Sequence, residues 1–412
     1  MTTRRALIVQ IPAAAIAGSV LSRVAFADDK SVTIGLTVPL TGADAEGAIL
    51  IKNGMMMAVD DANAKGGVAG YKINVMVLDN GTTTAGQYDP AQAATNARKL
   101  VSDQSVVANV GPEMSGSGKA MAPILSQGNL ATITPSSTNP DITDPKFAGQ
   151  FKPGGKAIYF RTVTTDAYQG PNMANYFAKN LKVKKVYILD DSGAYGVGMA
   201  DAFEAQAKKI GMAVLGHDQL DPKEADYTTI LTKVKQLNPD ALYYGGVALT
   251  GVKLAKQAYQ IIPNMIKGGG DGAMGAPILK GAGFPAMEGW YATIAAPYIA
   301  DNPEVQPWID TFKQKYGRGP VSYSFTAYDA TLAILDAIKQ VAAAGKPVNR
   351  DTVRDALQNG TFKTLQGTVS FDENGDIKDR TVSVFHCVHD SKYPDDDVLH
   401  QFKYMGVAPQ TS

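Results

Sequence analysis

The sequence predicts an α/β protein made of two lobes, each a doubly wound parallel β-sheet with helices on both faces. Apolar runs of strand length alternate with stretches of helical periodicity along most of the chain, which is the pattern of repeated strand–helix units. The alternation fills two halves of comparable length. The strands also read as near-continuous apolar runs, because helices cover both faces of a parallel sheet.

The first half contains the elements expected of one lobe. The first helix ends in K-G-G-V-A-G-Y, where glycine suits a left-handed C-cap. Residues 141–155 are polar and rich in Pro and Gly, so we expect a surface excursion there. Strands are expected at 31–39, 71–78, 106–110, 130–135 and 158–163, and helices at 49–64, 89–102 and 119–128.

The second half repeats the same rhythm and ends differently. Glycines at 268–275 and an extended segment at 292–297 suggest that the chain passes between the lobes more than once, so we expect a multi-crossing hinge. A closing hairpin is expected at 367–389. The other expected elements are strands at 185–189, 213–215, 241–244, 265–268 and 289–295, and helices at 172–180, 194–209, 227–237, 250–258, 305–315, 322–344 and 350–358.

Length and composition indicate a soluble globular protein of two or three domains. The chain has 412 residues, of which 45% are hydrophobic and 19% charged. Residues 1–27 hold three arginines and no acid, so the remainder carries 36 basic against 39 acidic residues, a net charge of −3. This balance gives no indication of nucleic-acid binding. Cys387 is the single cysteine, which excludes an internal disulfide.

Residues 1–27 are predicted to be an export signal peptide. Arg4 and Arg5 precede an apolar run that is short for a membrane span and contains Pro12, and A-F-A at 25–27 fits the small-x-small cleavage rule. We expect the mature protein to begin near residue 28. The paired arginines permit twin-arginine export and leave the general secretory route open.

The stretch at 106–140 is the candidate ligand site. It reads as a buried strand, the Gly/Ser loop G-P-E-M-S-G-S-G, a short helix, a second strand and the hydroxyl-rich loop P-S-S-T-N-P. Loops at the carboxyl ends of neighbouring parallel strands meet at one sheet edge, where open α/β folds bind ligands. The first loop also opens a helix, so backbone N–H groups are free beside Ser115 and Ser117. The pair of loops suits a carboxylate, although ordinary capping by serine gives the same pattern.

Three other motifs favour structural roles. G-A-Y-G-V-G at 193–198 opens a helix, but its glycine spacing differs from that of dinucleotide sites. Tyr195 within it suits either an ordinary half-exposed loop tyrosine or an aromatic wall of a ligand pocket. His386 and His389 point to opposite faces of a predicted strand, which disfavours a metal site. D-E-N-G-D at 372–376 has an incomplete calcium-loop spacing, and Asn-Gly is the usual turn signal. No Ser–His or zinc-protease motif indicates an enzyme, so we expect none.

Several motifs in fixed order resemble one family. They are I-G-L-T-V-P-L-T-G, D-A-N-A-K-G-G-V-A-G-Y-K-I, the G-P…S-G-S…T-P-S-S-T-N-P unit, R-T-V-T-T-D-A-Y-Q-G-P, Y-G-V-G-M-A and Y-Y-G-G. Together they cover essentially the whole mature chain. The sequence resembles the leucine/isoleucine/valine-binding proteins, the periplasmic receptors of branched-chain amino-acid ABC transporters. The resemblance implies a type I periplasmic binding protein with lobe 1 at 28–164 plus 294–371 and lobe 2 at 165–293 plus 372–412.

The resemblance also implies a set of binding residues. The loop hydroxyls match the groups that hold the ligand α-carboxylate, and two aspartates match positions that face the α-ammonium. Two tyrosines match aromatics that close over the ligand or border its side chain. The set is Ser115, Ser136 and Thr138 for the carboxylate, Asp166 and Asp271 for the ammonium, and Tyr195 and Tyr323 for the aromatics.

Two departures concern the pocket for the ligand side chain. Gly47 and Val247 stand where relatives carry larger residues. We therefore expect an aliphatic or aromatic amino acid as the ligand, and the identity of its side chain stays open. The implied protein is a periplasmic monomer with no cofactor, bound metal or nucleic acid, and it delivers its ligand to an ABC permease. The alternatives are a receptor for another small carboxylate, such as an aromatic acid, or for an amide, and an α/β enzyme.

Overall fold

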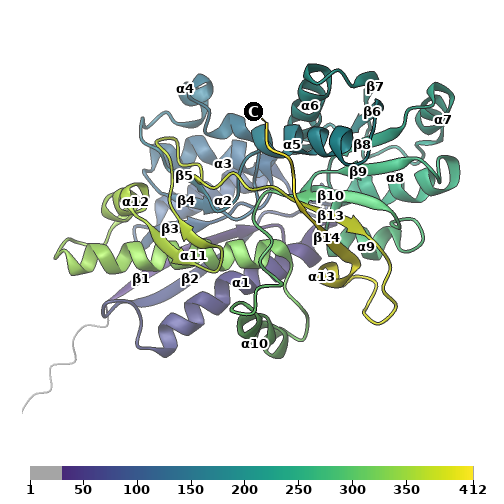
Figure 1. The fold of residues 1–412 in the computed structure, drawn as a ribbon. Coiled ribbons are helices and arrows are strands. Elements are labelled where there is room, and N and C mark those ends of the chain that lie inside the picture. The colour runs from purple at the N-terminus through teal and green to yellow at the C-terminus, as the bar shows by residue number, and fades with distance from the viewer. Residues whose placement is uncertain (1–29, 412) are drawn as a thin grey trace, which may run out of the picture.

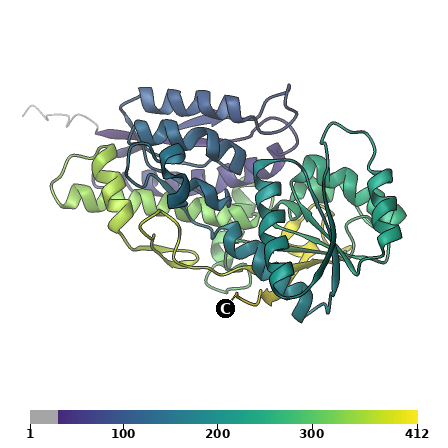
Figure 2. The same ribbon diagram turned by 90° about the horizontal axis from the view of Figure 1, so that it is seen from above.

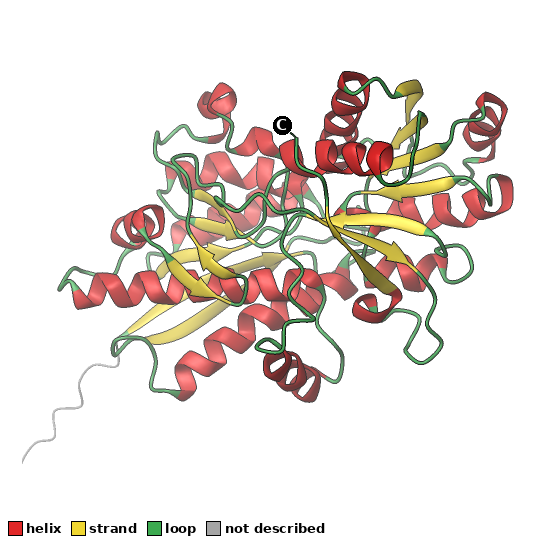
Figure 3. Cartoon of the chain, in the orientation of Figure 1, coloured by secondary structure: helices red, strands yellow, loops and turns green. Residues whose placement is uncertain are grey.

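The computed structural model describes residues 30–411 as two α/β lobes side by side (Figure 1). The predicted signal peptide lies outside the described residues. Figure 3 shows the strands of each lobe between layers of helices, as expected for a doubly wound sheet. Within the described residues, none of the helices combines the length and apolar character needed to span a bilayer.

Lobe 1 is built on a parallel five-stranded sheet of order β2-β1-β3-β4-β5. Its strands are β1 (Ser31–Val38), β2 (Lys72–Asp79), β3 (Val106–Val110), β4 (Thr132–Thr134) and β5 (Tyr159–Arg161). The helices and short strands packed on it are α1 (Ala45–Ala64), α2 (Pro90–Ser102), α3 (Ser115–Gln127), α4 (Ala148–Phe151), α10 (Gln306–Tyr316), α11 (Ser322–Ala343), α12 (Arg350–Asn359), β11 (Phe362–Thr364) and β12 (Gly367–Val369).

Lobe 2 is built on a seven-stranded sheet of order β14-β13-β10-β9-β8-β6-β7. β6 to β10 are parallel to one another, whereas β13 is antiparallel to both of its neighbours, β10 and β14. The strands are β6 (Lys185–Asp190), β7 (Ala213–Gln219), β8 (Ala241–Gly245), β9 (Ile266–Gly269), β10 (Trp290–Ile294), β13 (Ser383–Cys387) and β14 (Phe402–Val407). The helices are α5 (Asp166–Lys179), α6 (Ala194–Lys209), α7 (Thr228–Leu237), α8 (Ala248–Ile261), the 3₁₀ turn η3 (Asp271–Ala273), α9 (Ala276–Ala282) and α13 (Val398–Gln401).

The chain crosses between the lobes after β5, after β10 and before β13. These crossing segments are hydrogen-bonded to one another: Thr164 N–H donates to Ala295 O at 2.7 Å, and Ser383 Oγ donates to Ala296 O at 2.8 Å. Seen from above, the lobes lie on either side of these segments (Figure 2). The multi-crossing hinge predicted from the sequence is therefore present.

Close packing of α1 on α11 fixes the start of α11 beside the cleft. A Cβ placed on Gly54 in α1 would lie 2.2 Å from the carbonyl oxygen of Ser324, so only glycine fits this crossing. Ser324 Oγ also donates to Leu50 O at 3.0 Å. These contacts hold Tyr323, the residue before Ser324, at the boundary between the lobes.

The closing hairpin predicted at 367–389 is confirmed only at its tip, where Phe371 and Ile377 form an antiparallel bridge, and is wrong beyond it. The turn itself forms, because Asp372 Oδ1 accepts the N–H groups of Asn374 and Asp376, and Gly375 adopts a φ of 99°. After the turn, however, the chain crosses to lobe 2, where β13 joins the edge of β10. The edge of β10 offers unpaired backbone N–H and C=O groups, so the segment after the turn pairs with β10 rather than with the strand before the turn.

Two further predictions differ from the structure. The 141–155 excursion contains two 3₁₀ turns and α4, and it buries Ile142 and Phe151 in the core of lobe 1. The helix predicted to begin at residue 172 begins at Asp166, and Pro171 lies inside it. Pro171 lies beyond the first four N–H groups, which lack intrahelical partners in any helix, so the helix continues through it with one backbone hydrogen bond missing.

Candidate ligand-binding site

A cavity of about 100 Å³ lies between the two lobes. Lobe 1 contributes the loops after β3 and β4 and the beginnings of α1 and α11, and lobe 2 contributes the beginning of α6, η3 and α9. The cavity therefore lies at the carboxyl ends of parallel strands, where such folds bind ligands. Its apolar wall consists of Ile51, Met114, Val247, Met274, Ile278, Ile294, Val321 and Val398.

The first polar group of the cavity is the start of α3. The residue before the helix, Met114, is extended and provides no side-chain cap, so N–H groups of the first turn remain available to an anion. Ser115 begins the helix and lines the cavity, and Asn139 N–H donates to its Oγ at 3.2 Å. Ser136 also lines the cavity, and its Oγ donates to Glu113 O at 3.0 Å.

Thr138 lies behind this wall rather than on it. The side chain is fully buried, and its Oγ makes no hydrogen bond of normal geometry. The hydroxyl is still close enough to the Asp166 carboxyl to lower its pKa. The Thr138 carbonyl accepts the Asp166 N–H at 2.9 Å, and this bond ties the second loop of lobe 1 to the start of α5.

Asp271 is the centre of a second polar group, on the opposite side of the cavity. Its Oδ1 accepts hydrogen bonds from Tyr195 Oη at 2.8 Å and from Gln169 Nε2 at 2.6 Å. Its Oδ2 accepts one from Tyr323 Oη at 2.7 Å. Asp271, Tyr195 and Tyr323 all line the cavity. Two phenols and one amide thus orient a single carboxylate.

Asp166 lies behind Asp271 and shares Gln169 with it. Gln169 Nε2 donates to Asp166 Oδ1 at 3.1 Å, and Oδ2 of this fully buried carboxyl has no hydrogen-bond partner. Burial raises the pKa of Asp166, and the nearby Asp271 charge raises it further. Burial also raises the pKa of Asp271, against the three hydrogen bonds that lower it. Two adjacent carboxyls in a dry site favour a cation in the cavity, beside Asp271, over an anion.

Glu113 and Asp44 line the cavity and were not singled out in the sequence. Burial raises the pKa of Glu113 well above its usual range, and the charges of Asp44 and Asp271 add to the effect. Burial raises the pKa of Asp44 to about 6. Glu113 stands two residues before Ser115 in the G-P-E-M-S loop, so its place in a predicted ligand loop is the signal that could have found it. Asp44 gave no comparable signal.

The structure thus brings five of the seven predicted residues onto one cavity and buries the other two beside it. Ser115, Ser136, Tyr195, Asp271 and Tyr323 line the cavity, and Thr138 and Asp166 lie directly behind its walls. The two small residues that depart from the family pattern, Gly47 and Val247, also line it.

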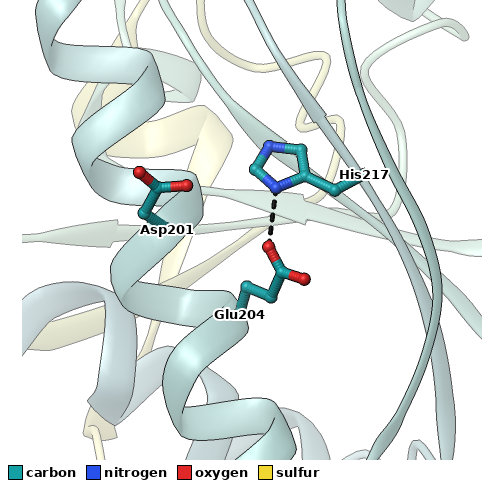
Figure 4. A group of neighbouring side chains, drawn as sticks. All are labelled: Asp201, Glu204 and His217. Atoms are coloured by element: carbon teal, nitrogen blue, oxygen red, sulfur yellow. Dashed lines mark hydrogen bonds and ion pairs between the residues drawn. The ribbon is translucent and has the colours of Figure 1, made fainter.

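A separate cluster of titratable groups lies away from the cavity, on α6 and β7. Figure 4 shows His217 facing Glu204, with Asp201 one helical turn away. His217 Nδ1 lies 2.8 Å from Glu204, and Nε2 lies 2.9 Å from the buried Asp190. The pKa of His217 is raised to about 9, chiefly by the hydrogen bond to Asp190. A carboxylate at each ring nitrogen favours an imidazolium ion pair rather than a metal ligand.

The other motifs weighed in the sequence have local structural contacts. His386 stacks on Tyr291 with ring centroids 4.2 Å apart, and His389 stacks on Phe284. Asp376 of the D-E-N-G-D segment pairs with the buried Arg161 at 2.7 Å. Arg161 in turn donates to the carbonyls of Ser137 and Asn139 and so supports the second ligand loop.

Two α/β lobes, joined by several crossings and enclosing a polar cavity, define the class of two-lobed solute-binding proteins. The model of the family described as "Periplasmic binding protein" matches residues 31–392. The chain belongs to this family and, within it, to the leucine/isoleucine/valine-binding proteins.

Known relatives span almost the same length. The Leu/Ile/Val-binding protein BraC3 of Rhizobium johnstonii is 31% identical over 355 residues, covering 86% of this chain and 91% of the relative. The leucine-, isoleucine-, valine-, threonine- and alanine-binding protein of Pseudomonas aeruginosa is 30% identical over 361 residues, covering 88% and 91%. The leucine-binding protein LivK of Thermotoga maritima superposes with a TM-score of 0.77 at 25% identity, covering 92% of this chain and 98% of LivK.

Proposed function

We propose that this protein captures a free amino acid in the cavity between its lobes and presents it to an ABC permease. The observation that carries the proposal is the pairing of two opposite sites across one cavity. The uncapped start of α3 with Ser115 suits an α-carboxylate. Asp271, held by Tyr195 and Tyr323, suits an α-ammonium. In this account Ser136 and Thr138 assist at the carboxylate, and Asp166 adds negative charge behind the ammonium.

Closure of the lobes is the proposed means of retaining the ligand. The lobes are in contact across the cleft: Asn139 Nδ2 donates to Ala194 O at 2.8 Å, and Lys280 Nζ lies 3.2 Å from Glu46. Such contacts favour a closed form that a permease can distinguish from an open one. The proposed lobe boundaries are 28–164 plus 294–371, and 165–293 plus 372–412.

The proposed setting follows from the family. Relatives are solute-binding proteins, and we infer that this chain is likewise an exported, periplasmic monomer that binds its ligand without transforming it. Its proposed partners are the ligand and a membrane permease, and we expect no cofactor.

A thermal-shift screen of the common amino acids, followed by calorimetry, tests the proposal. A ligand present at about 100 times its Kd raises the free energy of unfolding by about 2.7 kcal/mol, which a melting curve resolves. Mass spectrometry of the small molecule that co-purifies gives an independent answer. Binding of benzoate-type acids or amides, with no response to any amino acid, would replace the proposal with the other small-ligand alternatives.

A further inference from the structure

Glu113 presents a carboxylate to the cavity without a partner in the protein. It lies between β3 and α3, on the lobe 1 side. Its side chain is partly buried, and its buried Oε2 accepts no hydrogen bond. Among the described residues, no Lys, Arg or His forms an ion pair with it. A buried polar oxygen of this kind is destabilising unless something bonds to it.

Asp44 adds a second carboxyl to the same cavity. It immediately precedes α1, and only 3% of its surface is exposed. Tyr88 N–H donates to its Oδ2 at 3.1 Å, and no cation among the described residues pairs with it. The charge of Asp44 reaches Glu113, since it contributes to the raised pKa of Glu113.

Apart from Asp166, whose Oδ2 also lacks a partner behind the cavity wall, several other buried carboxyls differ because the protein itself satisfies them. Asp329 accepts two backbone N–H groups at 2.8 and 3.1 Å. Asp190 pairs with His217. Asp191 accepts the N–H groups of Gly193 and Val247. Glu113 lacks such donors and faces the cavity. We therefore expect a bound ligand to supply the hydrogen-bond donors that the protein does not.

The charges around the cavity do not balance with a simple zwitterion. Asp44, Glu113 and Asp271 line it, and among the described lining residues none is Lys, Arg or His. One α-ammonium at Asp271 leaves Glu113 and Asp44 uncompensated, which disfavours their ionised forms.

We propose that the ligand is an amino acid whose side chain ends in a second cationic group, an amine or guanidinium, which binds Glu113 with help from Asp44. This inference rests on the proposed function and narrows its ligand. The apolar wall, including Ile51 and Val321, accommodates the methylene stem of such a side chain. The cationic end donates to the free oxygens of Glu113 in charge-assisted hydrogen bonds.

Calorimetry with matched ligands tests the inference. L-ornithine and L-norleucine have the same number of heavy atoms and differ in the terminal ammonium or methyl; L-2,4-diaminobutyrate with L-norvaline, and L-lysine, vary the length. We expect one diamino acid to bind at least tenfold more tightly than its methyl counterpart. Glu113→Gln should remove most of that preference, because it keeps the shape and removes the charge. Glu373→Gln, an exposed change of the same kind, should leave the preference intact.

The possible results distinguish failure of the diamino-acid proposal from failure of the proposed amino-acid capture. If norleucine or norvaline binds as tightly as the matched diamino acid, or if Glu113→Gln keeps the preference, the proposal of a second cationic group on the ligand is wrong. The proposal that the protein captures an amino acid is then unaffected. If none of the amino acids binds, both are overturned. Thermal melting of Glu113→Gln verifies that the variant folds. Its melting temperature should stay close to that of the parent, because Gln keeps the shape and the raised pKa of Glu113 already disfavours the charged form.

Discussion

Tyr323 of lobe 1 donates its phenolic hydrogen to Oδ2 of Asp271 of lobe 2 across a distance of 2.7 Å. The bond joins the beginning of α11 to η3, two elements on opposite sides of the cavity. It therefore links ligand contact to lobe closure, because the same carboxylate that faces the cavity also holds the two lobes together.

Tyr323→Phe should weaken ligand binding and lobe closure together. A hydrogen bond to a charged group contributes about 1.5–3 kcal/mol, so we expect affinity to fall roughly tenfold to a hundredfold. X-ray scattering should show the ligand-induced decrease in radius of gyration only at higher ligand concentration. Tyr298→Phe removes a hydroxyl that bonds Asp301 at the surface and is the control. Equal affinity of Tyr323→Phe and the parent would exclude this bond from the closing contacts.

Thr138→Val tests the carboxylate side of the site. The Thr138 hydroxyl has no hydrogen bond of normal geometry in the protein, and valine keeps its shape. Thr138 lies behind the cavity wall in the protein without ligand, and if its hydroxyl donates to the bound carboxylate, loss of that donor should cost about 1–3 kcal/mol of binding free energy. Thr95→Val, on the exposed face of α2, controls for the substitution itself. An unchanged Kd on calorimetry would remove Thr138 from the ligand contacts.

Ligand binding should release protons near neutral pH. Burial raises the pKa values of Glu113 and Asp166 in the protein without ligand. A cationic group of the ligand favours their ionised forms, so binding lowers these pKa values. Affinity should then rise with pH toward about pH 8, the pKa of Asp166 without ligand, and the rise due to Asp166 should level off above it. Calorimetry in buffers of different ionisation enthalpy measures the released protons, and no buffer dependence would contradict the prediction.

His217 should make stability decrease with rising pH. Its pKa is raised from 6.5 to about 9 by Asp190 and Glu204. The folded state therefore binds the proton more tightly, and this stabilisation is complete below about pH 6.5 and lost as the pH rises through about 9. Asp201, which also faces the imidazole, adds to the same attraction.

Thermal melting of His217→Gln measures this contribution. The difference in melting temperature between parent and variant should be greatest below about pH 6.5 and shrink toward about pH 9. His389→Gln removes a more exposed histidine, whose side chain is 39% accessible, and controls for the substitution itself. A constant difference for His217→Gln across the range would show that the imidazolium ion pair is not the cause.

The sequence predicted the fold class and the family because both depend on patterns that repeat along the chain. Alternating apolar strands and amphipathic helices can be recognised from local sequence alone. The order of the motifs along the chain indicates the family. The terminal hairpin failed because the partner of β13 is β10, nearly ninety residues earlier in the chain, and local turn chemistry does not reveal a distant sheet edge.

The site was predicted in part for a similar reason. Ser115 and Ser136 follow two neighbouring strands, so their meeting at one sheet edge follows from parallel topology. Asp44 precedes a helix far from both, and its carboxyl reaches the cavity because α1 packs on α11, whose start also borders the cavity. Glu113 lay inside a predicted ligand loop, but its missing hydrogen-bond partners are visible only once the surrounding groups are placed.

Asp271→Asn, combined with removal of the ligand ammonium, tests the central claim most directly. The four pairings of parent or variant with the tightest-binding amino acid or its des-amino acid give the coupling between the carboxylate and the ammonium by calorimetry. We expect Asp271→Asn to weaken the amino acid tenfold or more, since losing one partner of a buried charge pair costs about 2–5 kcal/mol. The des-amino acid should bind the parent poorly and lose less on the substitution, whereas Asp301→Asn at the exposed surface should change neither. A des-amino acid that binds the parent as tightly as its amino acid would contradict the account.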